Sequence, residues 1–181
     1  WQVLDGTLCF ADISGFTALA ERLAQRGRMG GEELISRLGG VFADMLDIAR
    51  LESGALRTEI TDFDLADTYA DLERQFAPLA ARRGLRLRVT RPRYRVRSDR
   101  VLLRRVLQNL VSNALRYTRQ GGVLVGFQRR GESVELCVWD TGPGIPEMHQ
   151  RAIFEEFRRL DGPSPWGEKG LGLGLSICDR I

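Results

Sequence analysis

The middle of the chain carries a pattern of apolar and polar positions that is typical of strands joined by tight turns. Residues 85–89 alternate apolar and polar side chains, which predicts a half-buried strand, and residues 57–61 form a shorter strand candidate. Residues 122–129 and 132–139 flank the dipeptide Arg130-Gly131, and two such runs around a glycine predict a hairpin.

Two helices are expected between these strands. Asp64 is a good N-cap for a helix over residues 65–83, which Gly84 ends, and a second helix is expected after Ser98-Asp99. This order of strands and helices predicts an α+β fold, a two-layer α/β sandwich in which helices cover one face of a mixed sheet.

A strand-helix-helix segment is expected before this sandwich. Residues 6–17 form an apolar run that ends in a turn, and a helix follows over about residues 18–25. Apolar residues then recur every three or four positions, as in a helix that packs on a neighbour; they are Leu34, Leu38, Val41, Met45 and Ile48. That neighbour is either the chain's own domain or a second copy in a homodimer, and the sequence favours neither.

Composition narrows the classes of function. The 181 residues carry a formal net charge of +3, with Lys169 as the single lysine. Arginines gather between positions 82 and 105 without interleaved aromatics beyond Tyr94, which favours a solvated face over a nucleic-acid surface. No run approaches the roughly 18 apolar residues of a membrane span. A reducing cytoplasm is expected, because the three cysteines are isolated and indicate neither a metal cluster nor a disulfide framework: Cys9, Cys137 and Cys178.

Three motifs carry the candidate chemistry. Asp140 follows a strand, so its carboxylate can accept a hydrogen bond from an exocyclic amine such as that of adenine, and two glycines after it let the backbone approach a flat ring. Asn109 and Asn113 lie four apart on a helix, where their amide oxygens share one face and can bind Mg²⁺. The glycine run 170–174 opens into a helix start, where backbone N–H groups favour phosphate.

In this order the motifs resemble those of the ATP-binding catalytic domain of sensor histidine kinases, a member of the Bergerat-type ATPase group. The asparagine motif at 108–118, the aspartate-glycine motif at 139–146, the pair Phe154 and Phe157, and the glycine run stand at spacings typical of that family. The alternative is a glycine-punctuated fold without nucleotide.

The resemblance implies ATP and Mg²⁺ as ligands. Asn109, Asn113 and Arg116 are the implied catalytic residues, and the two asparagines are the implied metal ligands. Phe154 and Phe157 are expected to anchor in the core one edge of a lid formed by residues 158–169. The residues implied to bind the nucleotide are Asn113, Arg116, Tyr117, Asp140, Gly142, Gly144, Ile145, Lys169, Gly170, Leu171, Gly172, Leu173 and Gly174.

The same resemblance separates two reaction classes. In chaperone and mismatch-repair ATPases of this fold, the position of Asn109 resembles a glutamate that acts as general base on water, and an amide cannot take up a proton. Transfer of the terminal phosphoryl group to a protein histidine is therefore favoured, and a nucleotide-binding module without turnover is the alternative. His149, the single histidine, is expected to face solvent on a helix. The implied partners are a histidine-bearing dimerisation domain and a response-regulator receiver domain.

A different resemblance covers the N-terminal residues. Residues 1–45 resemble the opening of a class III nucleotidyl cyclase, in which Asp12 matches one metal-binding aspartate and Leu56 stands where the second is expected. An inactive cyclase remnant is a further alternative. Residues 46–57 resemble the end of a kinase dimerisation helix, and residues 58–181 resemble the ATP-binding domain, truncated at its C-terminal end. The chain is therefore interpreted as a chimera.

Overall fold

The computed structural model describes residues 39–40, 42, 45–46, 48–49, 51, 53, 57–131, 133–160, 166 and 171–181. By its internal contacts the chain divides into two units, Trp1–Ala43 and Asp44–Ile181. Asp12 and Leu56, on which the cyclase resemblance depends, lie outside the described residues, so that resemblance and the proposed domain boundaries stay predictions.

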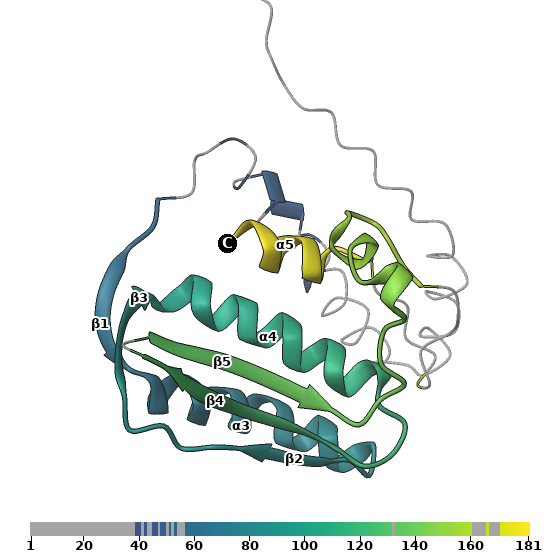
Figure 1. The fold of residues 1–181 in the computed structure, drawn as a ribbon, viewed down its shortest axis with the longest axis horizontal. Coiled ribbons are helices and arrows are strands. Elements are labelled where there is room, and N and C mark those ends of the chain that lie inside the picture. The colour runs from purple at the N-terminus through teal and green to yellow at the C-terminus, as the bar shows by residue number, and fades with distance from the viewer. Residues whose placement is uncertain are drawn as a thin grey trace, which may run out of the picture. The chain divides into compact units, whose positions relative to one another are not determined.

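Five strands of the second unit form two sheets (Figure 1). One sheet pairs β1 with β3 antiparallel. The other has the order β2-β4-β5, in which β2 runs parallel to β4 and β5 runs antiparallel to β4. The strands are β1 (Ile60–Asp64), β2 (Arg86–Val89), β3 (Arg95–Asp99), β4 (Gly122–Arg130) and β5 (Ser133–Asp140).

Three α-helices and two short 3-10 helices accompany these strands, and the described residues 45–46, 48–49 and 51 are also helical. The labelled helices are α3 (Leu65–Arg82), α4 (Arg100–Tyr117), η1 (Glu147–His149), η2 (Ala152–Phe154) and α5 (Gly174–Arg180). Figure 1 shows α4 lying alongside the three-stranded sheet and α5 lying against α4. None of the described helices is long and apolar enough to cross a membrane.

The core lies between the helices and one face of the three-stranded sheet. Val123 and Val125 of β4 are buried there, and side chains of β2 and β5 that alternate with exposed ones pack on the same cluster. The helices contribute their apolar stripes, which contain Leu65, Tyr69, Leu72, Phe76 and Ala80 on α3 and Leu107, Val111, Ala114 and Leu115 on α4. The predicted two-layer α+β sandwich is therefore confirmed.

Local signals set most element ends, and two predictions were confirmed by backbone geometry. Gly84 ends α3 with φ +64, a conformation that glycine adopts without strain. Gly131 takes φ +61 in the turn between β4 and β5, as the predicted hairpin requires. Asp99 caps α4, since its Oδ1 accepts hydrogen bonds from the backbone N–H groups of Val101 and Leu102 at 2.9 and 3.0 Å.

Two strand predictions differ from the structure. The strand expected over residues 57–61 is found over Ile60–Asp64, and Arg95–Asp99 forms a strand that was not expected. Both differences follow from the pairing of β1 with β3, which places Ile60 opposite Asp99. Asp64 does occupy the N-cap position of α3, but its side chain makes no capping hydrogen bond.

The helical residues that the structure describes between positions 45 and 51 pack on their own unit through apolar side chains. Ile48 is buried in a small cluster with Leu173 and Ile177, and Met45 and Leu51 pack against that cluster. This arrangement fits the alternative in which the helix lies on the chain's own domain. Three other stripe positions, Leu34, Leu38 and Val41, lie outside the described residues.

Candidate functional site

Asp140 ends β5 and turns its carboxylate toward the loop that follows. Its Oδ1 accepts a hydrogen bond of 2.7 Å from the N–H of Gly142, and among the described residues no other donor contacts this exposed carboxylate. A Cβ added at Gly142 would lie 2.7 Å from that oxygen and 3.4 Å from Thr118 Oγ1. A side chain at position 142 would therefore displace the Asp140 carboxylate, while Oδ2 remains available to an outside donor.

Thr141 fixes the strand end that carries Asp140. Its Oγ1 accepts from the N–H of Gly122 at 3.0 Å and donates to the carbonyl of Gln120 at 2.8 Å. Gly121 permits this contact with φ +97, since a Cβ there would lie 2.2 Å from the hydroxyl. Sequence reasoning missed Thr141; the signal was a hydroxyl residue beside Asp140 facing the glycine pair that opens β4.

The three candidate residues of α4 share one side of that helix. Asn109, Asn113 and Arg116 follow one another by four and three positions and are all half-buried. Asn109 Nδ2 donates to the carbonyl of Gly174 at 3.2 Å, which leaves its amide oxygen available as an acceptor or metal ligand. Tyr117, at the end of the helix, is exposed. These side chains form a polar strip along α4, and Asn109 joins this strip to α5.

The second glycine run leads tightly into α5. Gly172 has φ +77, and a Cβ there would lie 2.6 Å from the carbonyl oxygen of Arg158. Leu173 is buried against Ile177, so its side chain belongs to the core, whereas Leu171 is half-buried. The other two residues expected to bind nucleotide here, Lys169 and Gly170, lie outside the described residues.

Helix α5 is held to α4 by contacts next to this strip. Cys178 Sγ lies 3.7 Å from the carbonyl oxygen of Val106, and burial raises the pKa of the Cys178 thiol. At the far end of α5, Arg180 forms an ion pair with Glu156. The Gly174 carbonyl that Asn109 contacts is therefore part of a docked helix.

Trp166 is a further residue that sequence reasoning did not single out. Its indole N–H donates to the carbonyl of Thr118 at 3.2 Å, and the Arg83 guanidinium lies over its ring at 5.3 Å from the centroid. Thr118 is buried and donates its hydroxyl to the carbonyl of Ala114 at 2.7 Å. The available signal was an aromatic donor within a segment rich in glycine and proline.

Helix α4 joins the two glycine segments. Asn109 contacts Gly174, and the end of α4 lies against Gly142, whose added Cβ would be 3.4 Å from the carbonyl oxygen of Tyr117. Eight residues separate Asn109 from Tyr117, which is about 12 Å along a helix axis. The structure thus brings the asparagine motif, the aspartate-glycine motif and the described part of the glycine run to one helix.

Two expectations about neighbouring residues need correction. Phe154 and Phe157 were expected in the core, but 41% and 52% of their surfaces are exposed, and Phe157 takes φ 58 in a turn. His149 was expected on a solvent-facing helix; it ends the short 3-10 helix η1 and is half-buried. Gly144 has φ +70 with open space around it, and Ile145 beside it is exposed.

Known proteins resemble this chain in sequence. The family described as histidine kinase-, DNA gyrase B- and HSP90-like ATPase matches residues 98–181. The alginate biosynthesis sensor protein KinB of Pseudomonas aeruginosa is 35% identical over 83% of this chain and 25% of its own length. The adaptive-response sensory kinase SasA of Crocosphaera subtropica is 34% identical over 78% of this chain and 37% of its own length. The chain therefore spans well under half of these two relatives.

Solved structures show the same relationship. Full-length ShkA, solved in complex with AMPPNP, superposes with a TM-score of 0.69 at 25% identity, over 92% of this chain and 38% of ShkA. The nucleotide-free catalytic domain of the histidine kinase ThkA superposes with a TM-score of 0.58 at 30% identity, over 68% of this chain and 80% of that domain. With its match to most of a histidine kinase catalytic domain at this identity, the chain belongs to the histidine kinase branch of this ATPase family.

Proposed function

We propose that residues 58–181 bind ATP with Mg²⁺ and present its terminal phosphoryl group to a histidine on a partner domain. The observation that carries this proposal is the position of α4, which contacts Gly142 at one end and Gly174 through Asn109 near its middle. A nucleotide along this helix would meet both glycine segments at once. The AMPPNP bound to the structurally similar ShkA supports the same ligand class.

Asp140 is the proposed recognition residue for the base. Its exposed carboxylate keeps Oδ2 available while Oδ1 is fixed by Gly142, so a single orientation faces the exocyclic amine of adenine. Gly142, Gly144 and Ile145 would lie along the ring. A hydrogen bond to a charged group contributes roughly 1.5–3 kcal/mol, which is enough to select adenine over a base that lacks this donor.

The asparagine strip fits a hard cation. Asn113 and Asn109 offer amide oxygens from one side of α4, and Asn109 keeps its oxygen available because its nitrogen is used by Gly174. Amide oxygens together with phosphate oxygens are the ligands that Mg²⁺ prefers. When bound, Mg²⁺ would neutralise the negative charge that develops on the phosphate oxygens during transfer.

The remaining candidate residues would hold the phosphates. The fork of Arg116 can contact two phosphate oxygens at once, and Tyr117 can cap them from the end of α4. Backbone N–H groups of residues 169–174 would contribute at the start of α5. No general base for water is supplied by Asn109, since an amide cannot take up a proton, so transfer to a nucleophilic imidazole is the proposed reaction.

The acceptor and the next partner follow from the family. We propose a separate histidine-bearing dimerisation domain as acceptor and a receiver domain of a response regulator as the subsequent partner. In the transfer, the bond between the terminal phosphorus and the ADP oxygen breaks while a phosphorus-nitrogen bond forms at the imidazole. A cytoplasmic location is proposed because ATP is the substrate.

Calorimetry with ATP tests the proposed site. Asp140→Asn should weaken ATP binding roughly 10- to 100-fold, as expected for a lost charge-assisted hydrogen bond. Asp62→Asn removes an equally exposed carboxylate on β1 and should leave the affinity unchanged. Asn113→Ala should abolish the enhancement by Mg²⁺ while magnesium-free ADP binding is retained. Equal affinity of the Asp140→Asn variant and the parent would refute the assignment of the site.

A further inference from the structure

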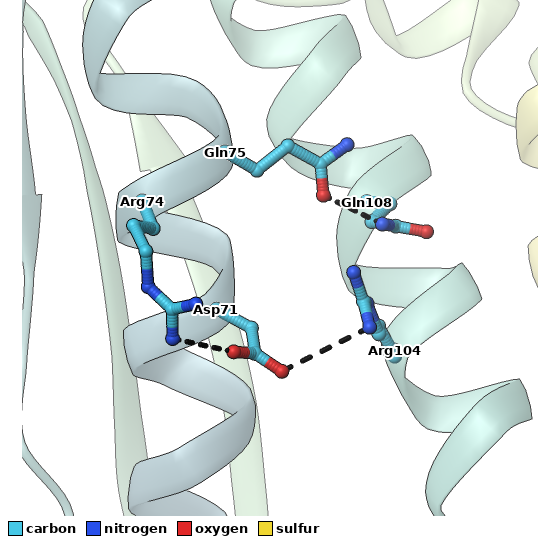
Figure 2. Close-up of a pocket in the computed structure, with 5 residues that line it drawn as sticks. All are labelled: Asp71, Arg74, Gln75, Arg104 and Gln108. Atoms are coloured by element: carbon cyan, nitrogen blue, oxygen red, sulfur yellow. Dashed lines mark hydrogen bonds and ion pairs between the residues drawn. The ribbon is translucent and has the colours of Figure 1, made fainter.

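A polar groove between α3 and α4 lies apart from the proposed nucleotide site. It is a shallow depression that is open to solvent, with a volume of about 490 Å³, and is lined by Asp71, Arg74, Gln75, Arg104 and Gln108. Figure 2 shows Asp71 pointing into the space between Arg74 and Arg104, and Gln75 and Gln108 meeting across it. The helix period of 3.6 residues places Arg100 and Arg104 about 180° and 140° around α4 from Asn109, and Gln108 about 100° from it.

The groove carries more positive than negative charge. Asp71 is the only carboxylate among its lining residues, and three arginines surround it: Arg74 at 2.8 Å, Arg104 at 3.8 Å and Arg100 at 4.0 Å. Their three positive charges against one negative charge leave a surplus of two. The distances to Arg104 and Arg100 are longer than direct hydrogen bonds, so both guanidinium groups can donate hydrogen bonds to a second carboxylate.

The spacing of these forks indicates the shape of the ligand. Arg100 and Arg104 stand one turn apart on α4, about 6 Å along the axis, and their side chains are 45% and 46% exposed. Carboxylates four residues apart on a partner helix have the same spacing. At the other end of the groove, the Gln108 side chain donates a hydrogen bond to Gln75 at 2.7 Å. Both side chains are uncharged amides, so this end of the groove carries no charge.

We propose that this groove is a docking site for an acidic helix of a partner protein, held by carboxylates one turn apart on Arg100 and Arg104. Asp71 acts there as an internal competitor, because its carboxylate lies 4.0 and 3.8 Å from the two guanidinium groups and partly neutralises their charge. Binding of this kind is electrostatic and weakens as salt increases. The groove and the nucleotide site can be occupied together, since Arg100 and Arg104 lie on the far side of α4 from Asn109.

Fluorescence anisotropy with a labelled alanine-based helical peptide tests this proposal on the full 181-residue chain. The peptide carries two glutamates four residues apart, and a matched peptide carries glutamines. The double change Arg100→Glu and Arg104→Glu should weaken the glutamate peptide at least about tenfold. The double change Arg86→Glu and Arg88→Glu, on exposed positions of β2, alters the net charge equally and should change binding less than about twofold.

Asp71→Asn should change the peptide affinity in the opposite direction. Removal of the competing carboxylate should strengthen peptide binding about threefold, an effect that loss of folding cannot produce. Thermal melting and ATP affinity should remain unchanged in all three variants. The proposal is overturned if the glutamine peptide binds as well as the glutamate peptide, if the β2 variant weakens binding as much as the α4 variant, or if inorganic phosphate alone saturates the groove at lower concentration than the peptide.

Discussion

Asn109 donates its side-chain N–H to the carbonyl of Gly174, at 3.2 Å, and thereby joins the middle of α4 to the first residue of α5. Gly174 lies close enough that an added Cβ would be 3.6 Å from the Asn109 side chain. The oxygen of the Asn109 amide is a proposed ligand of Mg²⁺, so this one side chain links the metal site to the glycine run. Its two functions can be separated, because they use different atoms of the amide.

Asn109→Asp should loosen α5 while keeping an oxygen for the cation. The aspartate replaces a donor with an acceptor opposite the Gly174 carbonyl, which removes a hydrogen bond worth about 0.5–1.5 kcal/mol and adds repulsion. Amide hydrogen exchange in residues 174–180 should therefore become about three- to tenfold faster without nucleotide. Asn113→Asp makes the same chemical change one turn further along α4 and is the control; equal exchange in both variants would contradict a specific role of Asn109.

Gly142→Ala should displace the carboxylate of Asp140. The new methyl group would lie 2.7 Å from Oδ1, where no carbon atom fits, so the loop or the carboxylate must move. We expect ATP affinity to fall at least about tenfold in calorimetry. Gly131→Ala, in the β4-β5 turn with φ +61 and open space around it, should lower stability but leave ATP affinity intact. Unchanged ATP binding of the Gly142→Ala variant would argue against the proposed position of adenine.

Asp99 should contribute to stability against acid. Hydrogen bonds from the backbone N–H groups of Glu59, Leu102 and Val101 hold the pKa of its carboxyl below the usual value. Its contribution is therefore fully present above about pH 4 and is lost as the pH falls through the lowered pKa. Asp99→Asn should flatten the fall of the unfolding free energy between about pH 5 and pH 2, measured by urea titration.

Asp64 supplies the matched control for this experiment. It occupies the N-cap position of α3 without a capping hydrogen bond from its side chain. Asp64→Ala should therefore lower the unfolding free energy at neutral pH less than Asp99→Ala does. Asp99→Ala should cost about 0.5–2 kcal/mol at neutral pH, as is usual for a lost helix cap. Equal acid profiles for the parent and Asp99→Asn would contradict this assignment.

Tyr69→Phe should destabilise the sandwich. The buried Tyr69 hydroxyl donates to the carbonyl of Gly126 at 2.6 Å and joins α3 to the middle of β4. Its loss should lower the unfolding free energy by about 1–2 kcal/mol in urea titration. Tyr94→Phe is the control, since the edge-on contact of Tyr94 with Phe127 needs only the ring. An equal or larger loss in the control would contradict a specific role of the Tyr69 hydroxyl.

The same tyrosine gives a prediction at high pH. Burial is the main cause that raises the pKa of Tyr69, because the protein interior disfavours the phenolate. The neutral form is thus favoured in the folded state, and its contribution is lost as the pH rises above about 10, where tyrosine ionises in the unfolded chain. Tyr69→Phe should make the alkaline decline less steep than in the parent, measured by thermal melting at stepwise increasing pH.

The isolated chain should not phosphorylate itself. Its single histidine, His149, is half-buried in η1, outside the motif expected around a phosphoacceptor. Incubation with labelled ATP should give no acid-labile, base-stable phosphoprotein. A separate dimerisation domain that carries its own histidine should become labelled only weakly, since the two domains are not tethered. Robust self-labelling that survives His149→Ala would exclude the proposed acceptor chemistry.

The sequence alone determined the features that depend on neighbouring residues. The ends of α3 and α4 follow from Gly84 and from the cap at Asp99, and the hairpin follows from the glycine between two apolar runs. The order of the asparagine, aspartate and glycine motifs was likewise readable, because each motif needs only a few residue types at short spacing. Membership of the histidine kinase family could therefore be predicted before the structure was known.

Only the tertiary structure decided which of these residues meet. The donation from Asn109 to Gly174 joins positions 65 residues apart, and the indole of Trp166 reaches Thr118 across 48 residues. The separate β1-β3 sheet and the exposed rings of Phe154 and Phe157 likewise depend on long-range pairing and packing. Such contacts depend on how whole helices and strands pack against one another. A local pattern of residues therefore does not show which distant residue each side chain will contact.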